Sequence, residues 1–208
     1  MTAVTAPAFK ALPPYMVMNE AFGEAMVTRL LAFALAREAA FSDTCIGRQG
    51  VVDKAVRSSR VCRDFGPLRE ELEERFRGKM AMAISTLGLS PFQLDKISME
   101  LAAHGDGDFY HRHIDTFIGA ERPATDRVLT GVYYFHDRPR AFEGGELRLF
   151  SLLPLEAGGS YVDIEPLNDS LLLFPAWVPH EVRPISCPGG GFAQSRFAIN
   201  CWYRRRRT

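Results

Sequence analysis

Hydrophobic residues recur at helical spacing in two stretches of the first half of the chain. The first stretch follows Asn19, a residue type that commonly caps the start of a helix. Its apolar positions are Phe22, Met26, Leu30 and Phe33. This spacing predicts a helix that begins just after Asn19 and ends near Ala40.

The second helical stretch begins at Pro67, which suits the first turn of a helix because that turn needs no backbone N–H. An acidic run at 70–74 follows, close to the positive end of the helix dipole. The apolar positions are Leu68, Leu72, Phe76 and Met80. We therefore predict a helix that ends at Thr86, before Gly88.

After Pro91 the pattern changes to short apolar segments separated by turn residues such as EGG (143–145) and PGGG (188–191). The predicted strands are 97–103, 109–114, 128–135, 146–149, 161–164, 170–174, 180–184 and 197–203. Residues 42–66 have a mixed pattern that indicates a loop with room for one short strand. Eight strands after a helical first half predict an α+β fold, a double-stranded β-helix (jelly roll) core buttressed by N-terminal helices.

Length and composition fit a single folded unit, because the chain has 208 residues of which 47% are hydrophobic. Residues 1–18 contain three prolines and no clear periodicity, so we expect an N-terminal extension there, either a tail or an edge segment. Residues 19–208 are expected to form one domain. Its helical support would span 19–92 and its jelly-roll core 93–203.

The charges balance, with 25 basic and 25 acidic residues, so nothing points to nucleic acid or to an anionic membrane. The longest apolar runs, such as 30–36, fall far short of the ~20 residues that span a bilayer. The N-terminus lacks a signal-peptide pattern, and the four cysteines show no CxxC spacing. We therefore expect a reduced, cytoplasmic protein. Twenty-one of the cations are Arg, including a terminal run at 204–207 that we expect to be solvated.

The segment YHRHID (110–115) offers candidate metal ligands. Residues i and i+2 of a strand share a face, so His113 and Asp115 can point toward one metal ion, with His180 as the third ligand. Two His and one carboxylate are the ligand set of non-haem Fe(II) oxygenases. His111 is a competing ligand two residues before His113, and a solvated His–Asp pair is the simpler alternative. His104 and His136 lie at predicted turns, where a surface or supporting role is expected.

Arg196 begins the alternating segment RFAINCWY, which is typical of an interior strand. Burying an Arg lowers the stability of the fold unless a carboxylate pairs with it. That carboxylate could belong to the protein, as an internal salt bridge, or to a bound dicarboxylate held by the guanidinium. Tyr134 could add a hydroxyl to the same carboxylate, although packing alone would explain either Tyr133 or Tyr134.

Five motifs occur in a defined order between residues 97 and 203: YHRHID (110–115), RVLTGVYYFHD (127–137), FEGGELRLF (142–150), LLLFPAWVPHEVRPI (171–185) and RFAINCWY (196–203). Together they resemble the catalytic domain of prolyl 4-hydroxylase-type 2-oxoglutarate/Fe(II) dioxygenases. The resemblance implies that His113, Asp115 and His180 bind Fe(II). It also implies that Arg196 and Tyr134 bind the distal carboxylate of 2-oxoglutarate.

The same resemblance implies O2 as a further cosubstrate, with ascorbate as a supporting reductant, and succinate and CO2 as products. Trp202 matches an aromatic position that closes the last motif, and Thr130 is assigned a structural role. The retained carboxylate of Asp115 favours hydroxylation over halogenation.

Two features depart from the family pattern. A Tyr that often precedes the first iron-binding His by about ten residues is missing, and Ala102–Ala103–His104 stand there instead. His104 could take over a polar contact. The segment 187–193 (CPGGGFA) also resembles an insertion that shapes the rim of the site.

Three substrate hypotheses follow. The first is a prolyl or other residue in a peptide or protein, the second a free amino acid or small metabolite, and the third a jelly roll that binds without turnover. Five arginines near the expected entrance would suit an acidic substrate, although solvent exposure explains them as well. They are Arg48, Arg57, Arg60, Arg63 and Arg122.

Overall fold

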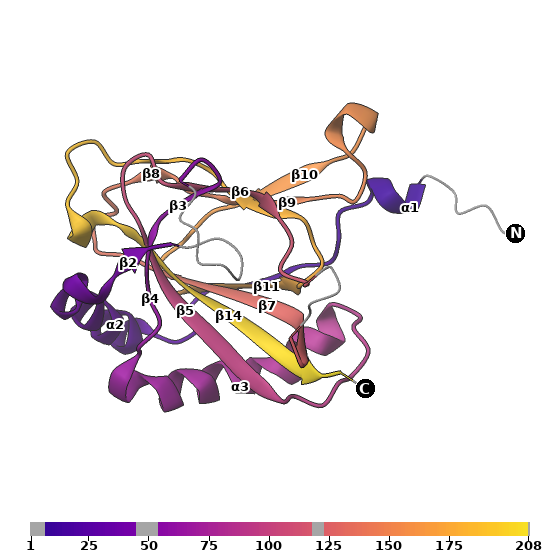
Figure 1. Ribbon diagram of the computed structural model, residues 1–208, viewed down its shortest axis with the longest axis horizontal. Coiled ribbons are helices and arrows are strands. Elements are labelled where there is room, and N and C mark those ends of the chain that lie inside the picture. The colour runs from indigo at the N-terminus through magenta and orange to yellow at the C-terminus, as the bar shows by residue number, and fades with distance from the viewer. Residues whose placement is uncertain (1–6, 45–53, 118–122, 208) are drawn as a thin grey trace, which may run out of the picture.

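The computed structural model describes residues 7–44, 54–117 and 123–207. Two long helices, α2 (Glu24–Ala36) and α3 (Arg69–Thr86), lie side by side beneath a large β-sheet, and a smaller sheet lies above it (Figure 1). The short helical segments are α1 (Pro7–Lys10), η1 (Glu38–Ala40), η2 (Gly66–Leu68), η3 (Leu155–Ala157) and η4 (Phe192–Gln194). The chain is mostly β-sheet with few helices, in a layered arrangement.

Within the described residues the large sheet has seven strands and the small sheet has five. The large sheet runs β1 (Met16–Met18), β11 (Ser170–Pro175), β7 (Thr125–Phe135), β14 (Arg196–Arg206), β5 (Lys96–His104), β4 (Arg60–Cys62), β2 (Ser42–Asp43). The small sheet runs β10 (Tyr161–Ile164), β9 (Leu147–Phe150), β12 (His180–Val182), β6 (Phe109–His113), β3 (Arg57–Ser58). A separate pair joins β13 (Ile185–Ser186) to β8 (Glu143–Gly144).

All eight predicted strands are present, with ends that differ by a few residues from the prediction. The structure adds six short strands, because pairing to a neighbouring strand makes extended segments regular even where the local pattern is weak. One of them, β1 (Met16–Met18), comes from the predicted extension and pairs with β11 at the edge of the large sheet.

The predicted start of the first long helix was wrong. The helix begins at Glu24, with Gly23 as its N-cap, and Asn19 does not cap it. Asp169, from the loop before β11, accepts hydrogen bonds from the backbone N–H groups of Phe22 and Gly23 at 2.9 Å each. This long-range contact keeps the chain non-helical up to Gly23, and no local sequence pattern predicts it.

The end of that helix was also predicted too late, because α2 stops at Ala36 and residues Glu38–Ala40 form a separate 3₁₀ turn. The second long helix agrees better with the prediction. A 3₁₀ turn containing Pro67 leads into α3, which ends at Thr86 as predicted.

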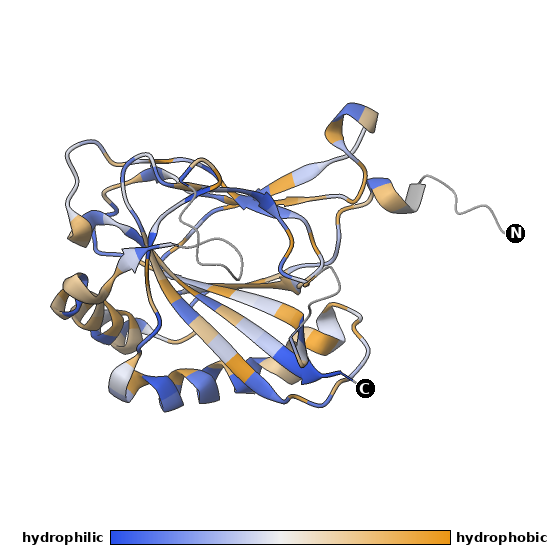
Figure 2. Ribbon diagram, viewed as in Figure 1, coloured by the Kyte–Doolittle hydropathy of each residue, from blue (hydrophilic) through white to orange (hydrophobic). Residues whose placement is uncertain are grey.

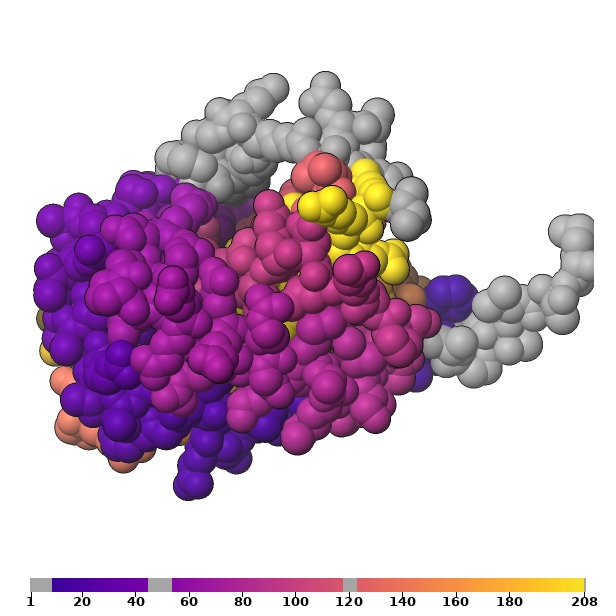
Figure 3. All heavy atoms as spheres, turned by 90° about the horizontal axis from the view of Figure 1, so that it is seen from below, coloured from indigo at the N-terminus to yellow at the C-terminus, as the bar shows by residue number. Residues whose placement is uncertain are grey.

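The core is divided by the large sheet. Alternate residues of β7 face opposite sides, so that Tyr133 and Phe135 join the cluster beneath the sheet while Val132 and Tyr134 join the cluster between the sheets. Figure 2 shows the corresponding alternation of polar and apolar bands along these strands. Seen from below, the N-terminal half of the chain, indigo to magenta, covers most of this face of the molecule (Figure 3). The helices thus seal one face of the large sheet and leave the space between the sheets for a site.

Among the described residues, no helix is both long and apolar enough to cross a membrane. Three cysteines, Cys62, Cys187 and Cys201, are free thiols in the interior. The fourth, Cys45, lies outside the described residues.

Candidate functional site

Two histidines meet across neighbouring strands of the small sheet. His113 ends β6 and His180 begins β12, and the two are direct partners in the antiparallel register, with ring centroids 4.1 Å apart. The backbone N–H of Asp115 donates to the carbonyl of Ala176 at 2.9 Å, which holds this residue beside the turn that precedes His180. The candidate ligand atoms of the three side chains all lie within 4.8 Å of one another. The predicted triad is therefore brought together in space.

Both imidazole rings are oriented by backbone carbonyls. Nδ1 of His113 lies 2.8 Å from the carbonyl oxygen of His111, and Nδ1 of His180 lies 2.8 Å from that of Val178. A carbonyl oxygen can only accept, so each Nδ1 carries the proton and each Nε2 keeps a free lone pair. Burial, followed by the neighbouring His180, lowers the pKa of His113 below its usual value. Because Nδ1 of each ring is engaged by a backbone carbonyl, Nε2 is the ring atom placed to bind a metal ion.

Asp115 is buried, and both of its carboxylate oxygens are held. Oδ2 accepts a 2.8 Å hydrogen bond from the hydroxyl of Thr130, and Oδ1 accepts one of 3.1 Å from Nη1 of Arg127. Burial alone would raise the pKa of Asp115, but His180 and Arg127 outweigh it and the pKa is lowered. The carboxylate is therefore ionised and fixed in orientation.

Thr130 and Arg127 support the triad from β7. The sequence analysis gave Thr130 only a structural role, although it shares a strand face with Val132 and Tyr134, and it missed Arg127, for which no local signal exists. Trp202, on the neighbouring strand β14, packs against the Arg127 guanidinium, 3.8 Å from its ring centroid. Trp202 thus packs against Arg127, the cation that binds the carboxylate of Asp115.

His111 is not part of the triad. Within the described part of the chain, the group of side chains that could hold a metal comprises His113, Asp115 and His180. His111 is exposed and contributes its backbone carbonyl to the orientation of His113.

Arg196 lies at the start of β14, between β7 and β5, and its side chain is almost fully enclosed, with 1% of the residue exposed. Among the described residues no carboxylate forms an ion pair with it, and its Nε and Nη2 atoms have no hydrogen-bond partner. Burial lowers the pKa of its guanidinium. Of the two alternatives for Arg196, the internal salt bridge is therefore absent from the described residues, and the guanidinium has unused donors.

Tyr134 lies beside Arg196, whose guanidinium carbon is 4.8 Å from the centre of the tyrosine ring. Its hydroxyl is buried without a hydrogen-bond partner among the described residues. Burial raises the pKa of Tyr134 to about 12, so the hydroxyl remains a donor. Tyr133 instead points to the helices and donates to Oδ1 of Asp169 at 2.8 Å. The two tyrosines, equivalent in sequence, have different roles because they occupy opposite faces of β7.

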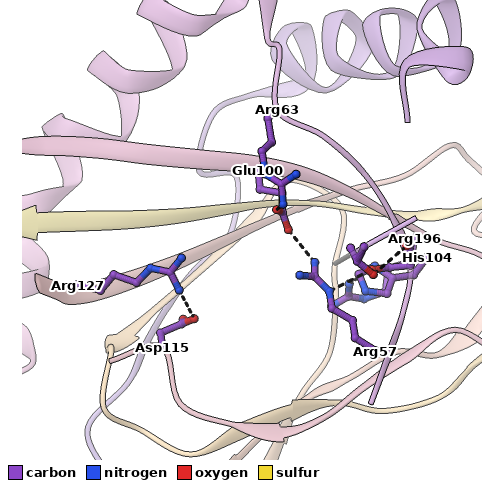
Figure 4. Close-up of polar contacts among 9 residues, drawn as sticks. Arg57, Arg63, Glu100, His104, Asp115, Arg127 and Arg196 are labelled. Atoms are coloured by element: carbon purple, nitrogen blue, oxygen red, sulfur yellow. Dashed lines mark hydrogen bonds and ion pairs between the residues drawn. The ribbon is translucent and has the colours of Figure 1, made fainter. Parts of the chain in front are cut away.

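Three of the five arginines predicted near the entrance are paired with glutamates. Glu100 lies between Arg57 and Arg63, with Nη2 to carboxylate oxygen distances of 2.7 and 2.6 Å (Figure 4). Arg60 pairs with Glu38 at 3.3 Å. Arg48 and Arg122 lie outside the described residues. The described arginines therefore give no support to an acidic substrate.

A protein-family profile described as the 2OG-Fe(II) oxygenase superfamily matches residues 99–204, which is about half of the chain and includes the triad, Tyr134 and Arg196. The chain belongs to this superfamily. The superfamily that this profile describes comprises oxygenases that use Fe(II) and 2-oxoglutarate.

A relative from a cyanobacterium is consistent with this membership. The chain is 37% identical over 139 residues to an uncharacterized PKHD-type hydroxylase of Synechocystis sp., a match that covers 65% of this chain and 45% of the relative. The chain therefore matches less than half the length of that protein.

Solved structures share the fold. A prolyl-4-hydroxylase of Pseudomonas putida is 24% identical, with 93% of each chain covered and a TM-score of 0.66. A prolyl hydroxylase of Trichoplax adhaerens, in complex with a hypoxia inducible factor peptide fragment, is 23% identical. The superposition covers 92% of this chain and 83% of that one, with a TM-score of 0.68.

Proposed function

We propose that this chain hydroxylates an unactivated C–H bond of a prolyl or other amino-acid residue in a peptide or protein. In this proposal the two facing sheets are the halves of a double-stranded β-helix. His113, Asp115 and His180 bind Fe(II) between them, and Arg196 and Tyr134 bind 2-oxoglutarate. Residues 19–208 act as one catalytic domain.

The donor set of the triad fits Fe(II). Two imidazole nitrogens, from His113 and His180, and the fixed carboxylate of Asp115 would hold Fe(II) and would leave it able to bind exchangeable ligands. Iron and 2-oxoglutarate together supply the oxidising power that lets O2 hydroxylate a C–H bond, with succinate and CO2 as coproducts. The protein's part is to hold the ligands in place: Thr130 and Arg127 keep Asp115 ionised and oriented.

The unsatisfied donors around Arg196 are the observation that carries the proposal. Nε and Nη2 of Arg196 and the hydroxyl of Tyr134 are buried, can all donate, and have no acceptor among the described residues. A buried guanidinium without an anion is costly, so its presence favours a site that binds a carboxylate. The distal carboxylate of 2-oxoglutarate offers acceptors only and matches these donors.

A peptide or protein substrate follows from the motif resemblance. A hydroxylase activity is also supported by the similarity to the PKHD-type hydroxylase of Synechocystis sp.. A free amino acid or small metabolite is the alternative substrate class, and the same assay tests it.

The decisive assay incubates the protein with Fe(II), 2-oxoglutarate, ascorbate and O2 and a set of proline-containing peptides, with free amino acids in parallel. Mass spectrometry then detects a gain of one oxygen atom, and succinate is measured in the same samples. Oxygen incorporation into peptides supports the proposal, whereas incorporation only into free amino acids replaces it with the alternative. Failure to form succinate with any substrate contradicts the assigned activity.

Two variants separate the roles of the binding residues. His180→Ala should abolish succinate formation and weaken iron binding, because two ligands cannot hold the metal as well as three.

Arg196→Ala should raise the 2-oxoglutarate concentration needed for turnover by ~10-fold or more while iron binding changes little, because it removes donors to a charged group. Equal effects of Arg196→Ala on iron and on 2-oxoglutarate would contradict its assignment.

A further inference from the structure

His104 is a buried histidine beside Arg196 that the proposed function does not use. It is the last residue of β5, directly opposite Arg196 in the antiparallel register with β14, and 3% of the residue is exposed. Nη1 of Arg196 lies 3.4 Å from Nδ1 of His104 (Figure 4). The predicted surface turn was therefore wrong for this residue, since the strand continues through it and places it in the interior.

The contact with Arg196 determines which nitrogen of His104 carries the proton. A guanidinium can only donate, so Nδ1 of His104 must accept the hydrogen bond from Nη1. In the neutral ring the proton then resides on Nε2, which becomes a donor. Burial, followed by the adjacent Arg196, lowers the pKa of His104 well below its usual value, so the ring stays neutral.

Nε2 of His104 has no hydrogen-bond partner among the described residues, although it is buried. It thus joins the unsatisfied donors of Arg196 and Tyr134 at the same place in the fold. A buried donor without an acceptor destabilises the folded state unless a bound group supplies one. All four atoms are donors, so the cluster as a whole suits a group that offers only acceptor oxygens.

We propose that His104 is a third side chain of the cosubstrate site, a neutral hydrogen-bond donor to 2-oxoglutarate through Nε2. The inference rests on the proposed function and adds to it a residue that sets cosubstrate affinity. His104 also accepts from Arg196, so it orients the guanidinium while donating to the ligand. It is a binding residue and a positioning residue at once.

The binding test measures 2-oxoglutarate affinity by isothermal titration calorimetry without O2, with Mn(II) in place of Fe(II). His104→Phe keeps a planar ring but removes both nitrogens, and the dissociation constant should rise by about 10- to 100-fold, the loss of one hydrogen bond to a charged group. His104→Gln retains an amide donor at similar reach, and its dissociation constant should stay within about fivefold of the wild-type value.

His136→Phe is the matched control. His136 is also buried and follows the neighbouring strand β7, but its Nδ1 lies 2.8 Å from the carbonyl oxygen of Asp137 and it has no contact with Arg196 among the described residues. This variant should leave the affinity for 2-oxoglutarate unchanged. Mn(II) affinity should be unchanged in all three variants, since none of them alters the triad.

A spectroscopic readout tests the contact in the wild-type chain. In the Zn(II)-loaded protein labelled with ¹⁵N-histidine, His104 should show the tautomer protonated at Nε2. The Nε2–H resonance should shift when 2-oxoglutarate is added. A purely structural histidine would keep its resonance, so this measurement remains decisive even if His104→Phe does not fold.

The possible results separate the two proposals. If the wild-type protein does not bind 2-oxoglutarate, both the proposed function and this inference fail. If it binds while His104→Phe binds equally well, or while the Nε2–H resonance does not move, the inference alone is overturned. A loss in His104→Phe that His104→Gln does not restore also counts against the donor role.

Discussion

Asp115 illustrates how much of the site depends on single contacts. Its two oxygens are held by Thr130 and Arg127, and Arg127 is in turn covered by Trp202. The motif HxD predicts from strand geometry that His113 and Asp115 point the same way, but β6 ends at His113, and the hydrogen bond from the backbone of Asp115 to Ala176 holds Asp115 beside the histidines. Both partners of Asp115 lie on β7, and the Trp202 that covers Arg127 lies on β14, so this support depends on how strands far apart in sequence pair.

Thr130→Val tests the support of Asp115 at the residue scale. Valine has nearly the shape of threonine but cannot donate to Oδ2, so the carboxylate loses one of its two anchors. Losing a group that orients a ligand typically weakens metal binding about 10- to 100-fold. We expect a loss of Mn(II) affinity in this range, measured by calorimetry without O2.

Thr125→Val provides the control for that substitution. Thr125 is buried on the same strand, and its hydroxyl accepts from Arg204, away from the triad. Its replacement should leave Mn(II) affinity intact. Equal losses in the two variants would show that damage to β7, and not the hydrogen bond to Asp115, is responsible.

At the scale of elements, the segment EGG (143–145), which was expected to be a connector, has a more specific role. β8 pairs with β13, and Gly145, with φ of +71°, lies directly against Arg196. A methyl group on Gly145 would lie 2.7 Å from Cδ of Arg196 and 2.9 Å from Cγ1 of Ile185. Glycine is therefore required for close packing over the guanidinium as well as for the turn.

Gly145→Ala should weaken 2-oxoglutarate binding by about 10-fold, because the added methyl displaces Arg196 from its position; overpacking typically costs about 1–3 kcal/mol. Calorimetry on the Mn(II) protein measures the effect. Gly189→Ala is the control, since Gly189 has φ of +74° and nothing within 4 Å of the added methyl. It carries the same backbone strain, so an equal loss of affinity there would contradict the packing argument.

The elements also show where local patterns are reliable. The eight strands and the end of α3 were predicted correctly, because alternation and helical spacing reflect which side chains are buried. The start of α2 was not, because Asp169 fixes the backbone of Phe22 and Gly23 from the other end of the chain. Short strands such as β1 (Met16–Met18) were missed as strands because their regularity comes from the neighbouring strand.

At the scale of the whole molecule, the two sheets enclose a polar site within an apolar interior. His104 and His136 are both buried, and burial lowers the pKa of each below the usual value. In the unfolded chain both rings take up a proton near pH 6.5 (about the usual histidine value), whereas the folded chain resists protonation there. The free energy of unfolding is therefore at its full value above this pH and decreases as the pH falls below it.

The metal-free protein should therefore lose stability below about pH 6.5, by up to ~1.4 kcal/mol per pH unit for each such histidine. Urea unfolding at pH 7.5, 6.5 and 5.5 measures the free energy of unfolding. The double variant His104→Gln, His136→Gln removes both groups and should show a shallower slope over this interval. A wild-type slope that is flat, or no steeper than that of the variant, would refute the assignment.

The sequence by itself determined that strands dominate the second half of the chain, where eight of them lie along it, and which residues are candidates for the triad and for the buried cation, Arg196. It could do so because burial periodicity and ligand spacing are local properties of the chain. The tertiary structure alone decided that no described carboxylate pairs with Arg196, that Tyr134 and not Tyr133 faces the site, and that His104 lies beside the guanidinium. These facts depend on strand register and on which face of each strand is turned inward, and the distances they set arise only when distant segments pack together.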